Sequence, residues 1–161
     1  MPQDMHPTEQ QHLYDYYIDE QGSWFCESNP VTDPQLFRLL SRSLFLRNGR
    51  YFVRCEGEVH PVRVADAPLW VRYVHLRTDA DGNLAAAEIE LQDGRREPLP
   101  ASTLTVARDE ALYCEATQRR LKARFGKVAY YELTRYLHLD EETGAFFFVI
   151  DGNRYDVKPA V

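Results

Sequence analysis

The sequence has 161 residues, of which 44% are hydrophobic, and its 25 acidic and 19 basic side chains give a formal net charge of −6. This length and composition are typical of one folded domain and exclude a disordered chain. The acidic balance disfavours bulk nucleic acid and anionic membranes as partners, because the chain as a whole repels polyanions.

The predicted elements begin after a polar N-terminal segment that lacks the apolar core of a signal peptide. We expect residues 1–11 to form a flexible tail and residues 12–161 to form a single compact domain. No apolar run approaches 18 residues, so the sequence predicts no membrane span.

Strand-like runs rich in β-branched and aromatic residues occupy most of this domain. Turn pairs such as Asn48-Gly49 and Asp81-Gly82 separate many of the runs, and these residues tolerate the positive φ of tight hairpins. Short turns join antiparallel neighbours, so the runs predict β-meanders. In chain order the runs are HLYDYYID, SWFCE, YFVRCEG, VHPVRVA, LWVRYVHLRT, LAAAEIELQ, TLTVA, ALYCEA, AFFFVI and RYDV.

Two segments depart from the two-residue period and predict helices over residues 33–47 and 126–138. Asp33 is suited to the N-cap of the first helix and Pro34 to its first turn, and we expect Asn48-Gly49 to end it. Each segment also has an apolar stripe at helical spacing. The stripes consist of Leu36, Leu40 and Leu44 in the first segment and Ala129, Leu133 and Leu137 in the second.

Together these elements predict an α+β fold of mainly antiparallel β-meanders with two helices. Pro98 and Pro100 interrupt the strand pattern and mark a candidate seam near residues 98–102, between two small β subdomains that pack together. The exposed edge strands of meanders must be paired or protected, so a homo-oligomer formed through such edges is one expected arrangement.

The three cysteines, Cys26, Cys55 and Cys114, form no CxxC pair, and their odd number gives no closed disulfide framework. Each lies in a strand-like run, so we expect buried free thiols that pack as small apolar residues. This usage is typical of a reducing compartment and predicts a cytoplasmic location.

Residues 117–127 contain five basic side chains and no acidic one. If the segment is a strand, Arg120, Lys122 and Arg124 share one face, and the strand leads into the second predicted helix. Arginine forks and first-turn N–H groups suit an anion, and neighbouring tyrosine rings add contact area. The candidate ligand-binding residues are therefore Arg120, Arg124, Lys127, Tyr130 and Tyr131. The alternative is a solvated face that carboxylates such as Glu110, Glu115 or Asp140 neutralise.

Glu58 and Asp66 are further candidates, because a hairpin that brought them together would form a carboxylate pair for general acid–base chemistry. The alternative for Asp66 is a turn that accepts hydrogen bonds from the backbone ahead of it. The five histidines show no metal-ligand spacing, and the sequence has no P-loop, nucleophile elbow or dinucleotide fingerprint. We therefore predict no metal site and no cofactor.

Three segments of the chain resemble blocks of the bacterial DUF1285 family. The segments are DEQGSWFCESNPVTDPQLFRLL, GRYFVRCEGEVHPVRVADAPLWV and RLKARFGKVAYYELTRYL, in the family's order. The second block includes the family-like Glu58 and the triplet from Asp66 to Pro68. Val59 stands where the family has a lysine, and Lys122 stands where the family usually has an acid. The resemblance implies a shared fold and carries no mechanism.

The leading functional prediction is a non-catalytic binding or interaction module whose partner is a small anionic or phosphorylated ligand or another protein. The alternative is a hydrolase-like enzyme that uses carboxylates or a histidine in a cleft between the two subdomains.

Overall fold

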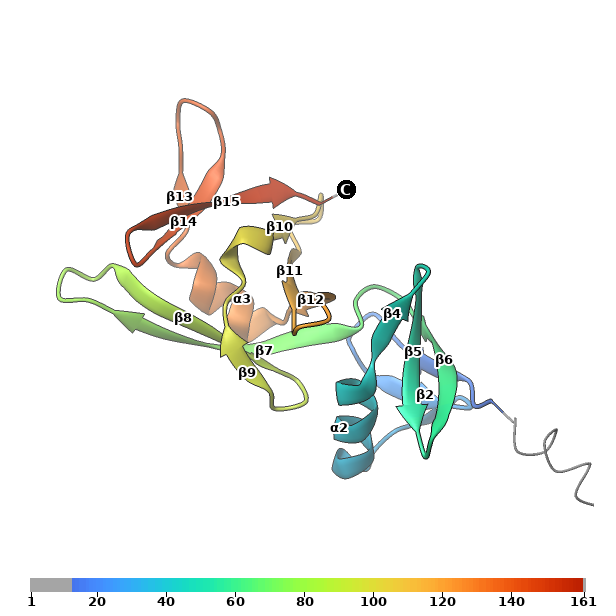
Figure 1. Ribbon diagram of the computed structural model, residues 1–161. Helices are drawn as coiled ribbons and strands as arrows, with labels where there is room; N and C mark the ends of the chain where they lie inside the picture. Colours follow the sequence, from blue (N-terminus) through green and yellow to red (C-terminus); the bar gives the residue numbers. More distant parts are fainter. Residues whose placement is uncertain (1–12, 161) are drawn as a thin grey trace, which may run out of the picture. The chain divides into compact units, whose positions relative to one another are not determined.

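The computed structural model describes residues 13–160. The chain divides into two compact units, the first ending at Pro68 and the second beginning at Leu69 (Figure 1). The sequence predicted one domain with a seam near residues 98–102, but that segment lies inside the second unit. The predicted flexible tail, residues 1–11, lies outside the described residues. Within those residues, no helix is long and apolar enough to cross a membrane.

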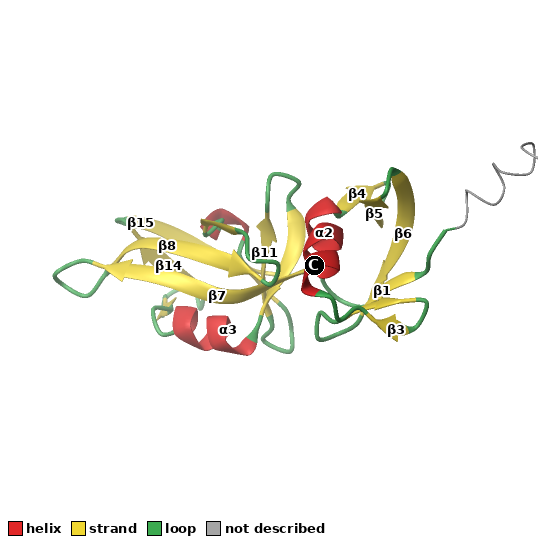
Figure 2. Cartoon of the chain, turned by 90° about the horizontal axis from the view of Figure 1, so that it is seen from below, coloured by secondary structure: helices red, strands yellow, loops and turns green. Residues whose placement is uncertain are grey.

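The first unit is a six-stranded sheet with one helix on one face (Figure 2). The strand order is β3-β2-β1-β6-β5-β4, and every neighbouring pair is antiparallel except β1–β6. The elements are β1 (Tyr16–Ile18), β2 (Trp24–Cys26), β3 (Asn29–Pro30), α2 (Pro34–Ser43), β4 (Phe45–Arg47), β5 (Arg50–Cys55) and β6 (Glu58–Val64).

Helix α2 begins where the sequence predicted and ends earlier. The Asp33 side chain caps the helix by accepting a hydrogen bond from the Gln35 N–H at 3.0 Å. The prediction that the helix continues to residue 47 is wrong, because Phe45–Arg47 pairs with β5 instead. Asn48 and Gly49 both have positive φ and form the hairpin turn between these strands.

The core of the first unit lies between α2 and the sheet. Leu40 of the helix and Leu44, which follows its end, are buried, as are Ile18, Trp24 and Val53 of the strands. His60 is buried on β6, and its Nδ1 accepts a hydrogen bond from the Tyr14 N–H at 3.2 Å. Alternate residues of each strand point away from α2, so one face of this sheet is free of helix within the unit.

The second unit is a nine-stranded sheet, part of which closes into a barrel. The strand order is β13-β14-β15-β10-β11-β12-β7-β8-β9. A further pairing of Ile150 with Leu84 joins β14 to β8, so the seven strands from β14 to β8 form a closed ring, with β13 and β9 outside it. The elements are β7 (Leu69–Thr78), β8 (Leu84–Leu91), β9 (Arg96–Pro98), a 3₁₀ helix (Ala101–Thr103), β10 (Thr105–Val106), β11 (Leu112–Ala116), β12 (Leu121–Phe125), α3 (Lys127–Thr134), β13 (His138–Leu139), β14 (Phe146–Ile150) and β15 (Asn153–Pro159).

The α+β class is confirmed, whereas the arrangement as simple meanders is wrong. The short turns do produce antiparallel hairpins such as β7–β8 and β14–β15. Three further pairings, β12–β7, β10–β15 and β14–β8, are parallel and join segments distant in sequence. Pro98 lies at the end of β9, an edge strand, where a missing N–H costs little.

Every second side chain along the strands points into the barrel and fills its interior. On β12, Leu121, Ala123 and Phe125 are buried, while the residues between them are not. Phe148 of β14 is fully buried. The segment LAAAEIEL is strand β8 despite its helix-forming residues, because cross-strand pairing and burial outweigh local propensity.

Helix α3 begins after Gly126 and is shorter than predicted. The Gly126 N–H donates to the Val71 carbonyl at 2.8 Å, and a Cβ on this glycine would lie 3.3 Å from the same oxygen. The helix ends at Thr134 rather than at residue 138, because His138–Leu139 forms β13 and the His138 ring stacks on Phe147 with centroids 5.1 Å apart.

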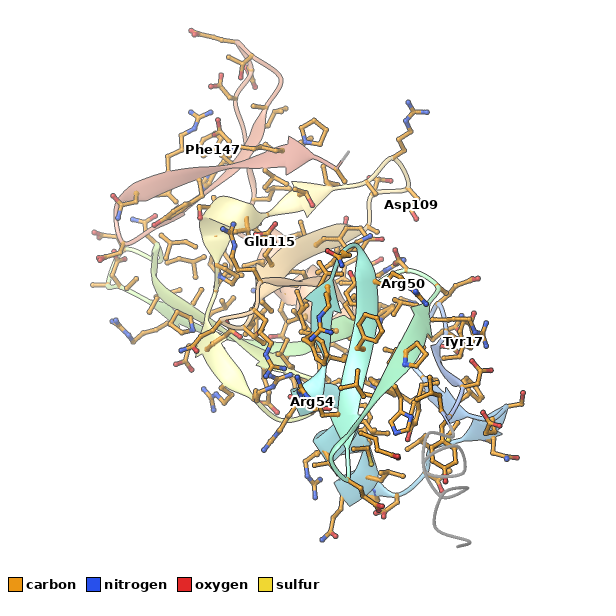
Figure 3. All side chains as sticks on the ribbon, turned by 45° about the vertical axis from the view of Figure 1, so that its right-hand side comes forward. Tyr17, Arg50, Arg54, Asp109, Glu115 and Phe147 are labelled. Atoms are coloured by element: carbon orange, nitrogen blue, oxygen red, sulfur yellow. The ribbon has the colours of Figure 1, made fainter. Side chains whose placement is uncertain are left out.

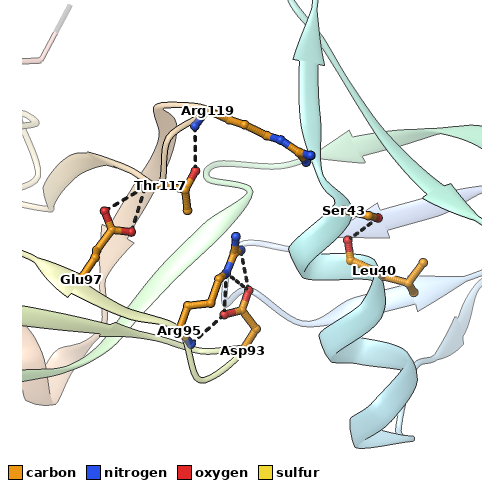
Figure 4. Close-up of polar contacts among 7 residues, drawn as sticks. All are labelled: Leu40, Ser43, Asp93, Arg95, Glu97, Thr117 and Arg119. Atoms are coloured by element: carbon orange, nitrogen blue, oxygen red, sulfur yellow. Dashed lines mark hydrogen bonds and ion pairs between the residues drawn. The ribbon is translucent and has the colours of Figure 1, made fainter.

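Polar side chains fix two turns at the end of β8 and β11 (Figure 4). The buried Asp93 carboxylate pairs with Arg95, with Oδ2 and Nη2 2.7 Å apart. The Glu97 carboxylate accepts a hydrogen bond from the Thr117 N–H at 2.9 Å. For the ion pair of Asp93 with Arg95, substitution of one partner would destabilise the fold, because the charge of the other would lose this counter-charge.

Only one of the cysteines, Cys114, is buried; Cys26 and Cys55 are half-buried. Cys114 is 2% exposed. Burial, reinforced by the carboxylates of Glu97 and Glu115, raises the pKa of its thiol to about 12. At pH 8 only about one thiol in ten thousand is then the reactive thiolate.

We therefore expect Cys114 to resist a charged disulfide reagent such as DTNB while the protein is folded. Kinetics of thiol release at pH 8, with and without denaturant, measure this directly. The slow thiol should disappear in Cys114→Ser and persist in Cys26→Ser. Rapid labelling of Cys114 in the folded protein would contradict the burial seen here.

Candidate functional site

A cleft of about 590 Å³ lies on the second unit. Its lining residues come from the end of β12 and the start of α3, from the start of β7 and from the turn that joins β10 to β11. The lining residues are Trp70, Asp109, Glu110, Ala111, Arg124, Phe125, Lys127, Tyr130 and Tyr131.

Arg124 is held in the cleft by aromatic neighbours on both adjacent strands. Its register pairs it with Tyr113 on β11 and with Trp70 on β7. The guanidinium lies 5.4 Å from the Trp70 ring centroid and 5.8 Å from that of Tyr113, and Nη1 lies 3.5 Å from the Tyr113 hydroxyl. Cation–π contacts with both rings therefore orient the guanidinium within the cleft.

The N-terminus of α3 adds positive electrostatic potential at the same place. Gly126 occupies the N-cap, so no side chain caps the first N–H groups, and the first turn contains no acidic residue. Lys127 is the first residue of the helix and is exposed. Uncapped N–H groups and the helix dipole both favour an anion here.

Two carboxylates also line the cleft. Asp109 and Glu110 belong to the turn between β10 and β11, where the Glu110 N–H donates to the Ala107 carbonyl (Figure 3 labels Asp109). The pKa of Tyr130 is raised by burial and, to a smaller extent, by the charge of Glu110 and by Tyr131. The cleft is therefore mixed in charge, with two bases and two acids in its lining.

Trp70 contributes a polar group without a partner. Its indole Nε1 is buried and has no hydrogen-bond acceptor among the described residues. A buried donor of this kind costs free energy unless water or a ligand supplies an acceptor. The orphaned N–H is therefore consistent with an acceptor group bound beside the ring.

The structure brings together four of the predicted ligand-binding residues, namely Arg124, Lys127, Tyr130 and Tyr131. Tyr130 and Tyr131 form an edge-to-face pair with centroids 5.3 Å apart. Arg120 does not line the cleft: it has a positive φ in the turn between β11 and β12, and its Nε donates to Glu115 at 2.8 Å. Arg120 therefore pairs with a neighbouring carboxylate, as the alternative for the basic segment expected of Glu115.

Glu58 and Asp66 lie in the first unit and are not brought together. Glu58 begins β6 and Asp66 follows its end, and a strand of this length extends about 20 Å. The Glu58 carboxylate instead lies 3.8 Å from Nε2 of the buried His60. No carboxylate pair for general acid–base chemistry therefore forms from these two residues.

The sequence pattern did not indicate Trp70, Asp109 or Glu110 as site residues, nor the apolar lining residues Ala111 and Phe125. Trp70 reaches the cleft through the parallel pairing of β7 with β12, which no local pattern indicates. Asp109 and Glu110 are ordinary turn residues by composition. Among residues 13–160, no group of three or more potential metal-ligating side chains lies together.

Two solved structures resemble this chain. One is a DUF1285 family protein from Silicibacter pomeroyi DSS-3, with a TM-score of 0.73 and 19% identity over 96% of this chain and 87% of that protein. The other is a DUF1285 family protein from Shewanella baltica OS155, with a TM-score of 0.59 and 18% identity over 74% of this chain and 90% of that protein. No protein-family model and no curated protein matches the sequence. The resemblance that three sequence blocks predicted is thus confirmed as a likeness of fold, and the chain has the fold of DUF1285 family proteins.

Proposed function

We propose that the second unit is a binding module for a small anionic ligand, and that this ligand occupies the cleft at the start of α3. The observation that carries the proposal is the convergence of Arg124 and Lys127 on an uncapped helix N-terminus. A phosphate or carboxylate group bound there would accept hydrogen bonds from the guanidinium and the first-turn N–H groups.

The two carboxylates in the lining bear on which anion fits the cleft. Asp109 and Glu110 repel a ligand that is negative throughout, but ionised carboxylates accept hydrogen bonds from hydroxyl groups. A phosphorylated metabolite that also carries hydroxyl groups matches both the basic and the acidic residues of the lining. Tyr130 and Tyr131 supply ring surface for its apolar parts.

A thermal-shift screen tests this proposal with inorganic phosphate, hydroxylated sugar phosphates, nucleotides and dicarboxylates as probes. A ligand at 100 times its Kd stabilises the folded state by about 2.7 kcal/mol, which is measurable as a rise in Tm. Binding should weaken at least tenfold in Arg124→Gln.

Arg120→Gln is the matched control, because it removes the same charge from the same basic segment outside the cleft. It should leave the shift unchanged. Equal loss of the shift in both variants would mean that net charge, and not the cleft, binds the probe. A flat response over the whole panel with folded protein would reject a small-anion site and favour a protein partner.

The remaining functional expectations stay predictions. One is a hydrolase-like enzyme with its active site in a cleft between two subdomains. The other is a homo-oligomer formed through the edge strands of the sheets. For the latter, the edge strands β3, β4, β9 and β13 are two or three residues long, which limits the number of hydrogen bonds that edge pairing offers.

A further inference from the structure

The sheet face of the first unit that points away from α2 has an unusual composition. Residues Tyr16, Ile18, Trp24 and Val53 point toward the helix side and are buried, so their strand neighbours point to the opposite side. We call this side the arginine–aromatic face; its members are Tyr17, Phe25, Phe45, Arg47, Arg50, Phe52, Arg54 and Arg63 (Figure 3 labels Tyr17, Arg50 and Arg54).

Cross-strand register places these residues in contact with one another. Phe45 pairs with Phe52 across β4 and β5, and their rings stack with centroids 5.6 Å apart. Arg54 lies 5.2 Å from the Phe45 centroid and Arg50 lies 5.7 Å from that of Phe52. Arg47 lies over the same pair, 5.3 Å from Phe45.

The charges at this end of the face are not neutralised by carboxylates. Within residues 13–160, no acidic side chain lies within ion-pair distance of Arg47, Arg50 or Arg54, and all three are exposed. Arg63 at the other end differs, because Asp15 pairs with it through two bonds of 3.1 Å. Segment 34–55, which contains β4 and β5, has five arginines and no acidic residue.

We propose that the arginine–aromatic face binds single-stranded nucleic acid. A guanidinium that lies over a ring offers its outer plane to a nucleobase and its N–H edge to a phosphate. Proteins that bind single-stranded nucleic acids combine basic side chains, which contact the phosphates, with aromatic rings, on which the bases stack. The open sheet face has both, because its stacked rings lie between arginines. An acidic peptide would use the N–H edges alone, leaving the stacked planes and rings without a role.

The net charge of −6 is compatible with this local site. Repulsion by distant acidic side chains is screened within about 10 Å at 0.1 M salt, whereas the three arginines act in direct contact. The acidic balance then limits binding to this face and disfavours attachment of nucleic acid elsewhere on the chain.

Fluorescence anisotropy of the full chain with labelled 12-mers of oligouridylate and oligothymidylate tests the proposal. Three arginine–phosphate contacts predict a slope of about −2 for log K against log salt, which is about a 100-fold loss of affinity from 20 to 200 mM. The double variant Arg50→Gln/Arg54→Gln should reduce the slope to about −0.7 and that loss to about fivefold.

The control is Arg38→Gln/Arg77→Gln, which removes two exposed arginines that lie on α2 and on β7. It should keep the slope of the unmodified chain. Phe52→Leu should weaken binding at least fivefold with the slope unchanged, because it removes stacking area and no charge. If the double variant fails to fold by circular dichroism, Arg47→Gln should still lower the slope by about 0.7.

Four results would overturn the proposal. They are absence of binding at 20 mM salt, equal losses in the double variant and its control, tighter binding of a duplex than of either single strand, and equal binding of a 12-residue polyglutamate peptide. The last result would reassign the face to acidic proteins.

Discussion

Phe148→Ala is expected to lower the free energy of unfolding of the second unit by about 3–5 kcal/mol. Phe148 is fully buried on β14, the strand whose pairing with β8 closes the barrel. Truncation removes the whole ring from a close-packed core, and the strands of a closed barrel are too constrained to collapse into the cavity. Denaturant unfolding followed by far-UV circular dichroism measures the loss.

Phe146→Ala is the matched control, because it makes the same substitution on the same strand and the same side. Phe146 is 46% exposed, so much of its ring stays in contact with water in the folded protein. We expect it to cost less than about 1.5 kcal/mol. Similar losses in the two variants would mean that Phe148 does not fill the barrel core.

Leu40→Ala is expected to destabilise the first unit by about 2.7–5 kcal/mol. Leu40 is 0% exposed on the face of α2 that packs against the sheet. The chain has two tryptophans, Trp24 in the first unit and Trp70 in the second, so fluorescence of Trp24 in a Trp70→Phe background follows this unit. The midpoint of the Trp24 transition should fall, with little change in its denaturant dependence.

Leu39→Ala, one residue earlier on the same helix, provides the control. Leu39 is 53% exposed, and alanine has the better helix propensity, so we expect a change within about 0.5 kcal/mol. A large effect at Leu39 would show that this side of α2 is buried against a partner in solution.

Parts of the cleft were predictable from residue types and spacing. The excess of basic residues near Arg124 and Lys127 and the start of a helix at this point are both properties of contiguous sequence. Tyr130 and Tyr131 follow on that helix. Arg120 was misplaced because the strand begins one residue later, at Leu121, and the turn before it directs the arginine to Glu115.

The arginine–aromatic face was missed although its arginines are visible in the sequence. Phe45 and Arg47 were assigned to the end of the predicted helix, and in that position they cannot pair with β5. The stacking of Phe45 on Phe52 requires the hairpin at Asn48-Gly49. One wrong helix boundary therefore concealed the whole surface.

The sequence by itself determined what is local: the two-residue period of strands, the cap at Asp33, the hairpin turns and the α+β class. These features depend on residues within a few positions of one another, where sterics and hydrogen bonding act directly. Only the tertiary structure decided the closure of the barrel by Ile150 and Leu84, the approach of Trp70 to Arg124, and the separation of Glu58 from Asp66. Such pairings form because burial of the core is cooperative, and no single segment carries that information.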